Sequence, residues 1–538
     1  MKISTSRQFA AVCLLGAAIS FLSSVAQAEA PSVKIATGML SGRDQDGVIS
    51  YLGIPYAAPP LGALRWRAPQ PAMPWHGTRP GSAFGPDCPQ LPISNDTTTT
   101  GQHSEDCLYI NVWRPSGIAR NLPVMVWIHG GGFVNGGSSS PMYNGSAFAR
   151  HGVVLVTLNY RLGRFGFFAF PALTREHPEE LKGNYGYMDQ IAALRWVQNN
   201  IAAFGGDAHN VTIFGESAGG GSVHALLTSP LTSGLFHRAI IESGGGRGSL
   251  LGPRKLDQGT DKVPSAETIG LNFAKENRID GDGQQALNAL RALPAERIVG
   301  GLSMQNLVGP QGPVTFAGPM RDGHIVVGDP DEIYRAHGQQ KVPVMIGVND
   351  GDIGRSSAGS LEELFSPFGP DRDAARAAYD PNKEQKLPQL GHDVAADRGM
   401  TEPARLTAQL ISDQGLPAYE YRFSYVSPAT RAALEKSPFK NVSATDGAKH
   451  GSELPFVFGT VSEMLPGISA ADEATAQAMT AYWANFAKIG NPDSGPLPHW
   501  PRYQRSEDML MNFTQAGPKA MPDPWRARLD LTEKYAQH

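Results

Sequence analysis

The sequence has little of three things that would each define a class of protein: surplus positive charge, cysteine and long apolar runs. Its 538 residues contain 46 Lys and Arg against 50 Asp and Glu, which gives a formal net charge of -4. A chain without a basic surplus is poorly suited to neutralise phosphates, so nucleic acid is not an expected partner. The three cysteines are too few for a scaffold held together mainly by disulfides.

The first apolar stretch of note lies at the N-terminus. Residues 1–28 combine a short basic start, an apolar stretch at 9–22 and the small-residue end Ala26-Gln27-Ala28. This is the layout of a secretory signal peptide, with cleavage expected after Ala28. The stretch of about 14 apolar residues falls short of the roughly 20 that span a bilayer. We therefore predict a periplasmic or secreted protein without a membrane anchor, whose mature chain keeps two cysteines, Cys88 and Cys107.

Short apolar runs recur along the mature chain and alternate with stretches of helical spacing. The runs lie at residues 124–128, 153–158, 211–214, 239–241, 342–348 and 418–425. Continuous apolar character in the middle runs suits strands that are buried on both faces of a sheet. Residues 187–200 instead repeat apolar positions at helical spacing. The alternation predicts an α/β fold with a central, mostly parallel sheet flanked by helices.

Residues 29–538 contain no linker-like stretch and no internal repeat, so we predict one large domain with insertions. Two segments, 252–338 and 354–408, are weakly patterned and favour helix. We expect both to form a cap over the C-terminal edge of the sheet.

One motif carries chemistry. The apolar run 211–214 leads into Gly215-Glu216-Ser217-Ala218-Gly219, and a helix-like stretch follows. Gly-x-Ser-x-Gly between a strand and a helix is typical of a nucleophile elbow, where a sharp turn exposes the serine hydroxyl at the sheet edge. The flanking glycines are needed because side chains there would clash. This context argues against a chance glycine turn, and Ser217 is the predicted nucleophile.

A serine nucleophile also needs a base, an orienting carboxylate and donors for the oxyanion. His129-Gly130-Gly131-Gly132 directly follows the run 124–128. The N–H groups of Gly131 and Gly132, joined by that of Ala218, are the predicted oxyanion donors. A phosphate cradle would need Gly-x-x-x-x-Gly-Lys, or Gly-x-Gly-x-x-Gly after a strand, and neither pattern is present. His129 precedes the donors, so we expect it to be structural.

These motifs make the chain similar to a type-B carboxylesterase, of the cholinesterase and carboxylesterase group within the α/β-hydrolases. The resemblance covers almost the whole mature chain. Its motifs include EDCLYINVWRP (105–115), WIHGGGF (127–133), GNYGYMDQ (183–190), FGGDAHNVTIFGESAGG (204–220) and HGSELPFVFG (450–459).

The resemblance implies the remaining catalytic residues through the family order of serine, acid and histidine. His450 takes the place of the base. Asp352 takes the place of the acid, where most relatives carry glutamate. Because aspartate is one methylene shorter, Asp350 or a nearby glutamate remains an alternative. The resemblance further implies supporting roles for Ser243 and Glu453 near the triad.

The resemblance also implies a disulfide between Cys88 and Cys107, and a chemistry without cofactor or metal. In cholinesterases the loop closed by this disulfide supplies a tryptophan that stacks on a quaternary ammonium. Residues 89–106 contain no aromatic residue here, so choline esters are not favoured.

The implied function is a serine carboxylic ester hydrolase that acts on a small-molecule ester and water through an acyl-enzyme. One alternative is a specialist for a single bulky ester, lactone or carbamate. The other is a non-catalytic binding or adhesion module of the same fold. We predict no particular oligomeric state.

Overall fold

The computed structural model describes residues 1, 30–92, 101–117, 120–248, 254–260, 262–304, 307, 314–436, 447–465 and 467–536. Apart from Met1, the predicted signal peptide at residues 1–28 lies outside the described residues. Among the described helices, none has the length and apolar character needed to cross a membrane.

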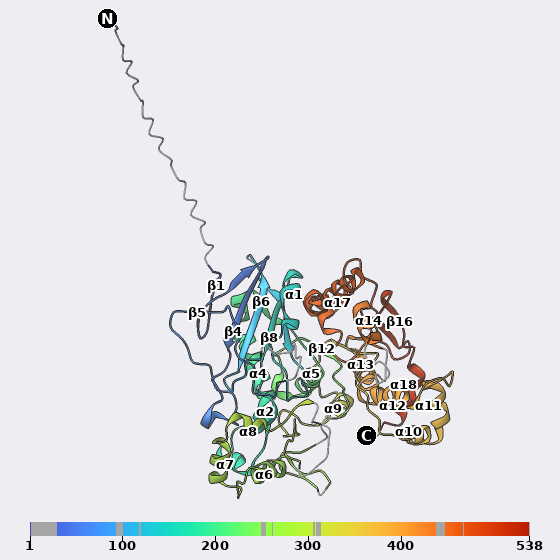
Figure 1. The fold of residues 1–538 in the computed structure, drawn as a ribbon, viewed down its shortest axis with the longest axis horizontal. Coiled ribbons are helices and arrows are strands. Elements are labelled where there is room, and N and C mark those ends of the chain that lie inside the picture. The colour runs from blue at the N-terminus through green and yellow to red at the C-terminus, as the bar shows by residue number, and fades with distance from the viewer. Residues whose placement is uncertain are drawn as a thin grey trace.

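An 11-stranded sheet runs through the centre of the described structure, in the order β16-β15-β14-β13-β12-β11-β7-β8-β6-β4-β3 (Figure 1). Neighbours from β8 to β15 in this order are parallel, and the pairs toward both edges are antiparallel. The predicted mostly parallel α/β sheet is confirmed. The strands are β3 Arg43–Gln45, β4 Val48–Pro55, β6 Tyr109–Pro115, β7 Leu122–Ile128, β8 Val154–Leu158, β11 Gly206–Glu216, β12 Arg238–Glu242, β13 Val344–Asn349, β14 Ala418–Phe423, β15 Met509–Thr514 and β16 Gly517–Pro522.

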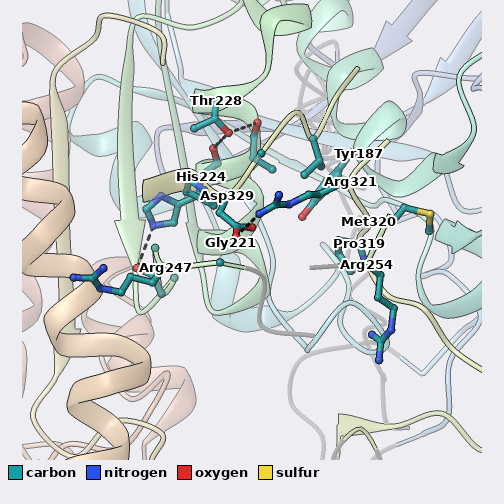
Figure 2. A pocket seen from close by; sticks show the side chains of 18 of the residues that line it. Tyr187, Gly221, His224, Thr228, Arg247, Arg254, Pro319, Met320, Arg321 and Asp329 are labelled. Carbon is teal, nitrogen blue, oxygen red and sulfur yellow. Dashed lines mark hydrogen bonds and ion pairs between the residues drawn. The ribbon is translucent and has the colours of Figure 1, made fainter. Parts of the chain in front are cut away.

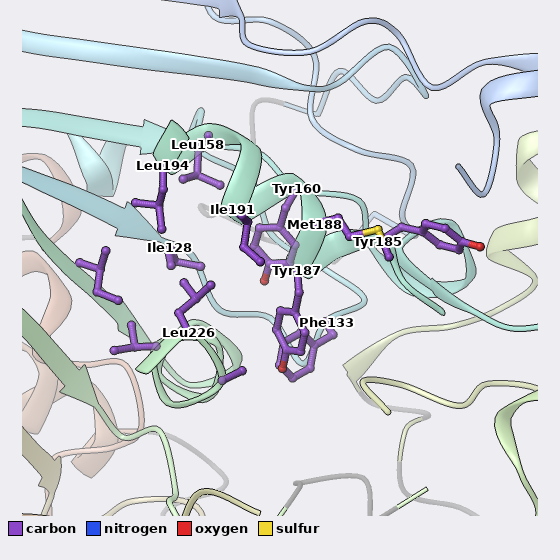
Figure 3. Packing of buried hydrophobic residues seen from close by; sticks show 14 of the residues in the cluster. Ile128, Phe133, Leu158, Tyr160, Tyr185, Tyr187, Met188, Ile191, Leu194 and Leu226 are labelled. Carbon is purple, nitrogen blue, oxygen red and sulfur yellow. The ribbon is translucent and has the colours of Figure 1, made fainter. Parts of the chain in front are cut away.

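Side chains alternate between two cores because successive residues of a strand point to opposite faces. In β11, Ile213 joins the core on one face, and Phe214 joins the core on the other. The first core includes residues of α4 (Tyr185–Asn200) and α5 (Ala218–Thr228), and Figure 3 shows Ile191, Leu194 and Leu226 packing near Ile128. The second includes Trp483 and Phe486 of α17 (Ala470–Ile489). Burial on both faces explains the continuously apolar runs.

The first weakly patterned segment forms α6 (Ala266–Glu276), α7 (Gln284–Arg291), α8 (Ala295–Val299) and α9 (Pro330–Arg335). In the second, α10 (Leu361–Phe365), α11 (Arg372–Tyr379) and α12 (Leu387–Ala396) form a small core of their own, against which α18 (Arg526–Lys534) packs.

The expectation of a cap was wrong for the last part of the second segment. There α13 (Glu402–Ser412) packs against β13 and β14. The physical reason is that its residues Ala404 and Ala408 are buried in the core of the main sheet.

The remaining elements are short or peripheral. A three-stranded sheet contains β1 (Ser32–Ile35), β2 (Gly38–Ser41) and β5 (Thr78–Pro80), and β9 (Phe167–Phe168) pairs with β10 (Gly183–Asn184). The other helices are α1 (Ser146–Arg150), α2 (Gly163–Gly166), α3 (Pro171–Glu176), α14 (Pro428–Lys436), α15 (Leu454–Val457) and α16 (Val461–Met464). Cys88 and Cys107 form the expected disulfide, with Cα atoms 5.0 Å apart.

Candidate active site

Ser217 lies at the turn between β11 and α5. Its backbone has φ 57° and ψ -121°, a conformation that residues with side chains rarely adopt. The flanking glycines make the turn possible. A Cβ on Gly215 would lie 2.6 Å from the backbone of Gly219, and a Cβ on Gly219 would collide with the Ile128 carbonyl. The Ser217 N–H donates to the Glu242 carbonyl at 2.9 Å, which ties the turn to β12.

The glycine loop lies beside this elbow because β7 and β11 pair in parallel, with Ile128 opposite Gly215. A Cβ on Gly130 would lie 3.0 Å from the Cβ of Ser217. Within the described residues, the N–H groups of Gly131, Gly132 and Ala218 donate no hydrogen bond. These three donors are therefore available to an oxyanion.

His129 is buried at the start of this loop. Its Nδ1 lies 2.9 Å from the Gly130 carbonyl, and its ring stacks on Tyr160 with centroids 4.5 Å apart. Burial lowers its pKa to about 4. These contacts fit the structural role expected from its position in the sequence.

Asp352 follows β13 and contacts His450. Its Oδ1 lies 2.6 Å from Nδ1 of His450, and its Oδ2 accepts from the Ser243 hydroxyl at 2.6 Å. The N–H of Ile353 donates to Oδ1 at 2.7 Å. Burial raises the pKa of Asp352, but the charge of His450 and these hydrogen bonds outweigh burial and hold the pKa below its ordinary value.

Asp350, the alternative acid, has a different partner. Its Oδ1 accepts from the backbone N–H of Ala448 at 2.6 Å, two residues before His450. The N–H of Gly351 donates to the Ala448 carbonyl at 2.9 Å. Of the two aspartates, Asp350 thus fixes the backbone of the histidine loop, and Asp352 contacts the imidazole ring.

The second nitrogen of His450 faces Glu216. The distance between His450 Nε2 and Glu216 Oε1 is 3.1 Å, an ion-pair contact outside hydrogen-bond geometry. In this structure Nε2 makes no hydrogen bond within the described residues, so His450 and the Ser217 hydroxyl are not hydrogen bonded. Glu216 is a residue that the sequence reasoning missed, although it stands inside the Gly-x-Ser-x-Gly motif.

The charges of these groups shift each other's pKa. Burial lowers the pKa of His450, but Glu216 and Asp352 outweigh it and raise the pKa to about 10. Burial raises the pKa of Glu216 to about 7; the Asp352 charge adds to this rise and the His450 charge opposes it. Each carboxylate therefore favours the imidazolium form of His450.

Glu453 is linked through Asn349 to the loop that carries His450. The Asn349 side-chain amide donates to Glu453 Oε2 at 2.5 Å and to the Lys449 carbonyl at 2.7 Å. Burial raises the pKa of Glu453 to about 8. The structure thus brings both residues implied as supporting, Ser243 and Glu453, close to the acid and base.

A metal site is suggested by one group in the described part of the chain, formed by His177, Glu179 and Glu180 after α3. Glu180 is already paired with the guanidinium of Arg67, which supplies a positive charge at this position. The group includes none of the residues around Ser217.

The sheet, the elbow and the loops at the strand ends define the class of protein: an α/β-hydrolase. Comparison with known proteins then places the chain within that class. The carboxylesterase family profile matches residues 29–378 and 371–528. The chain belongs to this family and is a carboxylic ester hydrolase.

Individual relatives support the same placement. A fumonisin B1 esterase from Sphingopyxis macrogoltabida is 35% identical, over 96% of this chain and 93% of that one. Para-nitrobenzyl esterase from Bacillus subtilis (strain 168) is 34% identical, over 87% and 91%. A solved structure of PNB esterase is 32% identical, covers 93% of this chain and 99% of its own, and has a TM-score of 0.76.

Proposed function

We propose that the chain hydrolyses esters through an acyl-enzyme, with Ser217 as nucleophile, His450 as base and Asp352 as the orienting acid. The observation that carries the proposal is the 2.6 Å contact between Asp352 Oδ1 and His450 Nδ1, on loops that lie beside the serine elbow. An acid in this position keeps the proton on Nδ1, so that Nε2 is free to accept one.

In the first half of the reaction, the Ser217 oxygen attacks the ester carbonyl while His450 Nε2 takes the hydroxyl proton. The N–H groups of Gly131, Gly132 and Ala218 stabilise the negative charge that forms on the carbonyl oxygen. Collapse of the intermediate breaks the bond to the alcohol, which leaves with the proton from His450. Water then attacks the acyl group, gives a proton to His450 and releases the acid and the free serine.

The resting contact between His450 and Glu216 must give way during this cycle, because Nε2 has to reach the serine proton. Ser243 supports the acid by donating to the oxygen of Asp352 that does not face His450. Glu453, through Asn349, supports the backbone that leads to His450.

Hydrolysis of simple 4-nitrophenyl esters by the purified mature protein tests this proposal. Ser217→Ala should reduce kcat by at least about 10³-fold, since removing the nucleophile leaves binding and the oxyanion donors alone. A sulfonyl fluoride should label the parent protein at Ser217. Equal rates in the parent protein and the variant would contradict the proposal. A parent protein that neither hydrolyses the esters nor is labelled would favour a binding module.

The breadth of the activity is a separate question. Rates on a series of esters that differ in their acyl and alcohol groups separate a broad esterase from a specialist. The series includes fumonisin B1, because one relative is a fumonisin B1 esterase. Comparable kcat/KM values across the series would favour the broad enzyme, and a single strongly preferred ester would favour the specialist.

We also propose that residues 1–28 direct export and that the mature protein, one domain from residue 29, is periplasmic or secreted. The Cys88–Cys107 disulfide supports an oxidising compartment. N-terminal sequencing of the exported protein should begin at Glu29, and a protein that retains residues 1–28 in the cytoplasm would contradict the proposal.

A further inference from the structure

A cavity of about 290 Å³ lies beside the elbow helix α5 (Figure 2). Three of its lining residues belong to the segments that hold the proposed site. Gly221 lies one helical turn after Ser217, Phe133 directly follows the glycine loop, and Gly244 directly follows Ser243. A group bound in this cavity would therefore lie next to the proposed nucleophile.

The charged residues of the cavity wall are mostly positive. Four arginines line it, against one acidic side chain, Asp329. The arginines are Arg247, Arg254, Arg321 and Arg398. The whole chain has a formal charge of -4, so the sign of this wall is opposite to that of the molecule.

His224 also lines the cavity and adds no charge near neutral pH. Burial lowers its pKa to about 4. Its Nδ1 lies 2.8 Å from the Tyr334 hydroxyl, and its Nε2 lies 3.2 Å from the Gly245 carbonyl. The positive charge of the wall therefore comes from the arginines.

Two of the arginines are held by acidic partners of the protein. Arg247 makes two hydrogen bonds of 2.6 Å to Glu402, and Arg321 pairs with Asp329 across the cavity wall (Figure 2). Arg254 is partly buried, and its Nη1 donates to the Ala317 carbonyl at 3.2 Å.

Arg398 differs from the arginines that are paired with acids. It lies on the helical turn Asp397–Thr401 between α12 and α13, and its side chain is exposed. It makes no ion pair within the described residues. Its guanidinium lies 5.0 Å from the centre of the Phe368 ring, and Arg398 makes no side-chain hydrogen bond to another described residue.

We propose that this cavity is a subsite for a carboxylate carried by the ester, and that Arg398 is its main anchor. The preferred substrates are then esters with a second, free carboxylate, such as monoesters of dicarboxylic acids. A guanidinium binds a carboxylate through two parallel hydrogen bonds, and this geometry gives selectivity over a neutral group of similar shape. The inference rests on the proposed esterase activity and names its substrate class.

Two matched pairs of esters test the proposal and locate the carboxylate. The first pair is mono-4-nitrophenyl adipate and 4-nitrophenyl hexanoate, which differ by a carboxylate in the acyl group. The second pair is 4-carboxyphenyl butyrate and phenyl butyrate, which differ by a carboxylate in the alcohol. We expect kcat/KM to be about tenfold higher for the acidic member of one pair, and the preference to fall in 0.5 M salt.

The variants separate charge from folding. Arg398→Gln should lower kcat/KM for the preferred acidic ester about fivefold and change that for its neutral match less than twofold. Arg398→Lys should keep part of the preference, because the charge remains. Arg195→Gln is the matched control, since Arg195 is an exposed arginine of α4 that does not line the cavity.

Several outcomes would overturn the inference. They are no preference for either acidic ester, a preference that Arg398→Gln leaves intact, and an equal loss on both members of a pair. Adipate binding to the Ser217→Ala variant, measured by calorimetry, gives a readout without turnover. If adipate binds the Ser217→Ala variant weakly or not at all, and adding Arg398→Gln does not change this binding, the proposed subsite would be contradicted. Loss of hydrolysis for all esters, with adipate still bound through Arg398, would contradict the proposed catalysis alone.

Discussion

At the scale of single residues, the two nitrogens of His450 face two carboxylates. Asp352 holds Nδ1 at 2.6 Å, and Glu216 lies 3.1 Å from Nε2. Only the first contact matches what an orienting acid does, because Nε2 must be turned toward the serine. We therefore assign the orienting acid to Asp352 in the proposed mechanism, and Glu216 is a second carboxylate that the sequence did not single out.

Replacing the acid tests this assignment. Asp352→Asn should lower kcat/KM by about 10³- to 10⁴-fold, because an amide does not stabilise the imidazolium and favours the wrong tautomer. Asp350→Asn should retain most of the activity, since its Oδ1 can still accept the Ala448 N–H. Steady-state kinetics on one 4-nitrophenyl ester measures both. A larger loss in the Asp350 variant would assign the acid to Asp350 instead.

Glu216 should control the pH dependence. Its carboxylate favours imidazolium and helps to raise the pKa of His450 to about 10, whereas catalysis needs neutral imidazole. Glu216→Gln removes this charge and lowers the pKa of His450, so the acid limb of the pH profile of kcat/KM should move to lower pH. Glu473→Gln, an exposed change on α17, should leave the limb in place. A limb that stays or moves to higher pH in Glu216→Gln would contradict this role.

At the scale of elements, the strands and the elbow were predictable and the walls of the site were not. Strands such as β8 are buried along their whole length, and burial on both faces leaves a continuous apolar run in the sequence. The contact of Glu216 with His450 depends on side-chain geometry between segments more than 200 residues apart, which no local pattern records. Arg398 stands in a segment of weak pattern, so its place in the cavity required the fold.

One buried ion pair joins two C-terminal elements. Arg422 of β14 makes bonds of 2.7 and 2.8 Å to Asp523, and its guanidinium lies 3.9 Å from the centre of the Trp525 ring, just before α18. Both charged side chains are buried. The pair holds the start of α18 to the sheet.

Breaking this pair should destabilise the protein. Asp523→Asn leaves the charge of Arg422 buried without a full partner, which should lower the free energy of unfolding by about 3 kcal/mol. Asp413→Asn, which removes an exposed partner of Arg505, should have a much smaller effect. Urea unfolding followed by circular dichroism measures both. Equal stability of the two variants would show that the buried pair contributes no more than a surface pair.

At the scale of the whole molecule, the disulfide constrains the N-terminal part of the chain. Cys88 and Cys107 are separated by 19 residues, and closing a loop of this length stabilises the folded state by about 3 kcal/mol through the unfolded chain. Replacing both cysteines with serine should lower the free energy of unfolding by about that amount and leave kcat/KM for simple esters nearly unchanged. An unchanged denaturation midpoint would contradict this estimate.

The strand order places β11 between two halves of the sheet. The strands that precede it in the sequence lie on one side, and those that follow it lie on the other, as the blue and red ends of Figure 1 show. The glycine loop belongs to the first half, whereas Asp352 and His450 belong to the second. When the chain is divided after α5 and the two fragments are expressed separately, ester hydrolysis should therefore require that the fragments associate. The enzyme is thus a candidate reporter of protein association by fragment complementation.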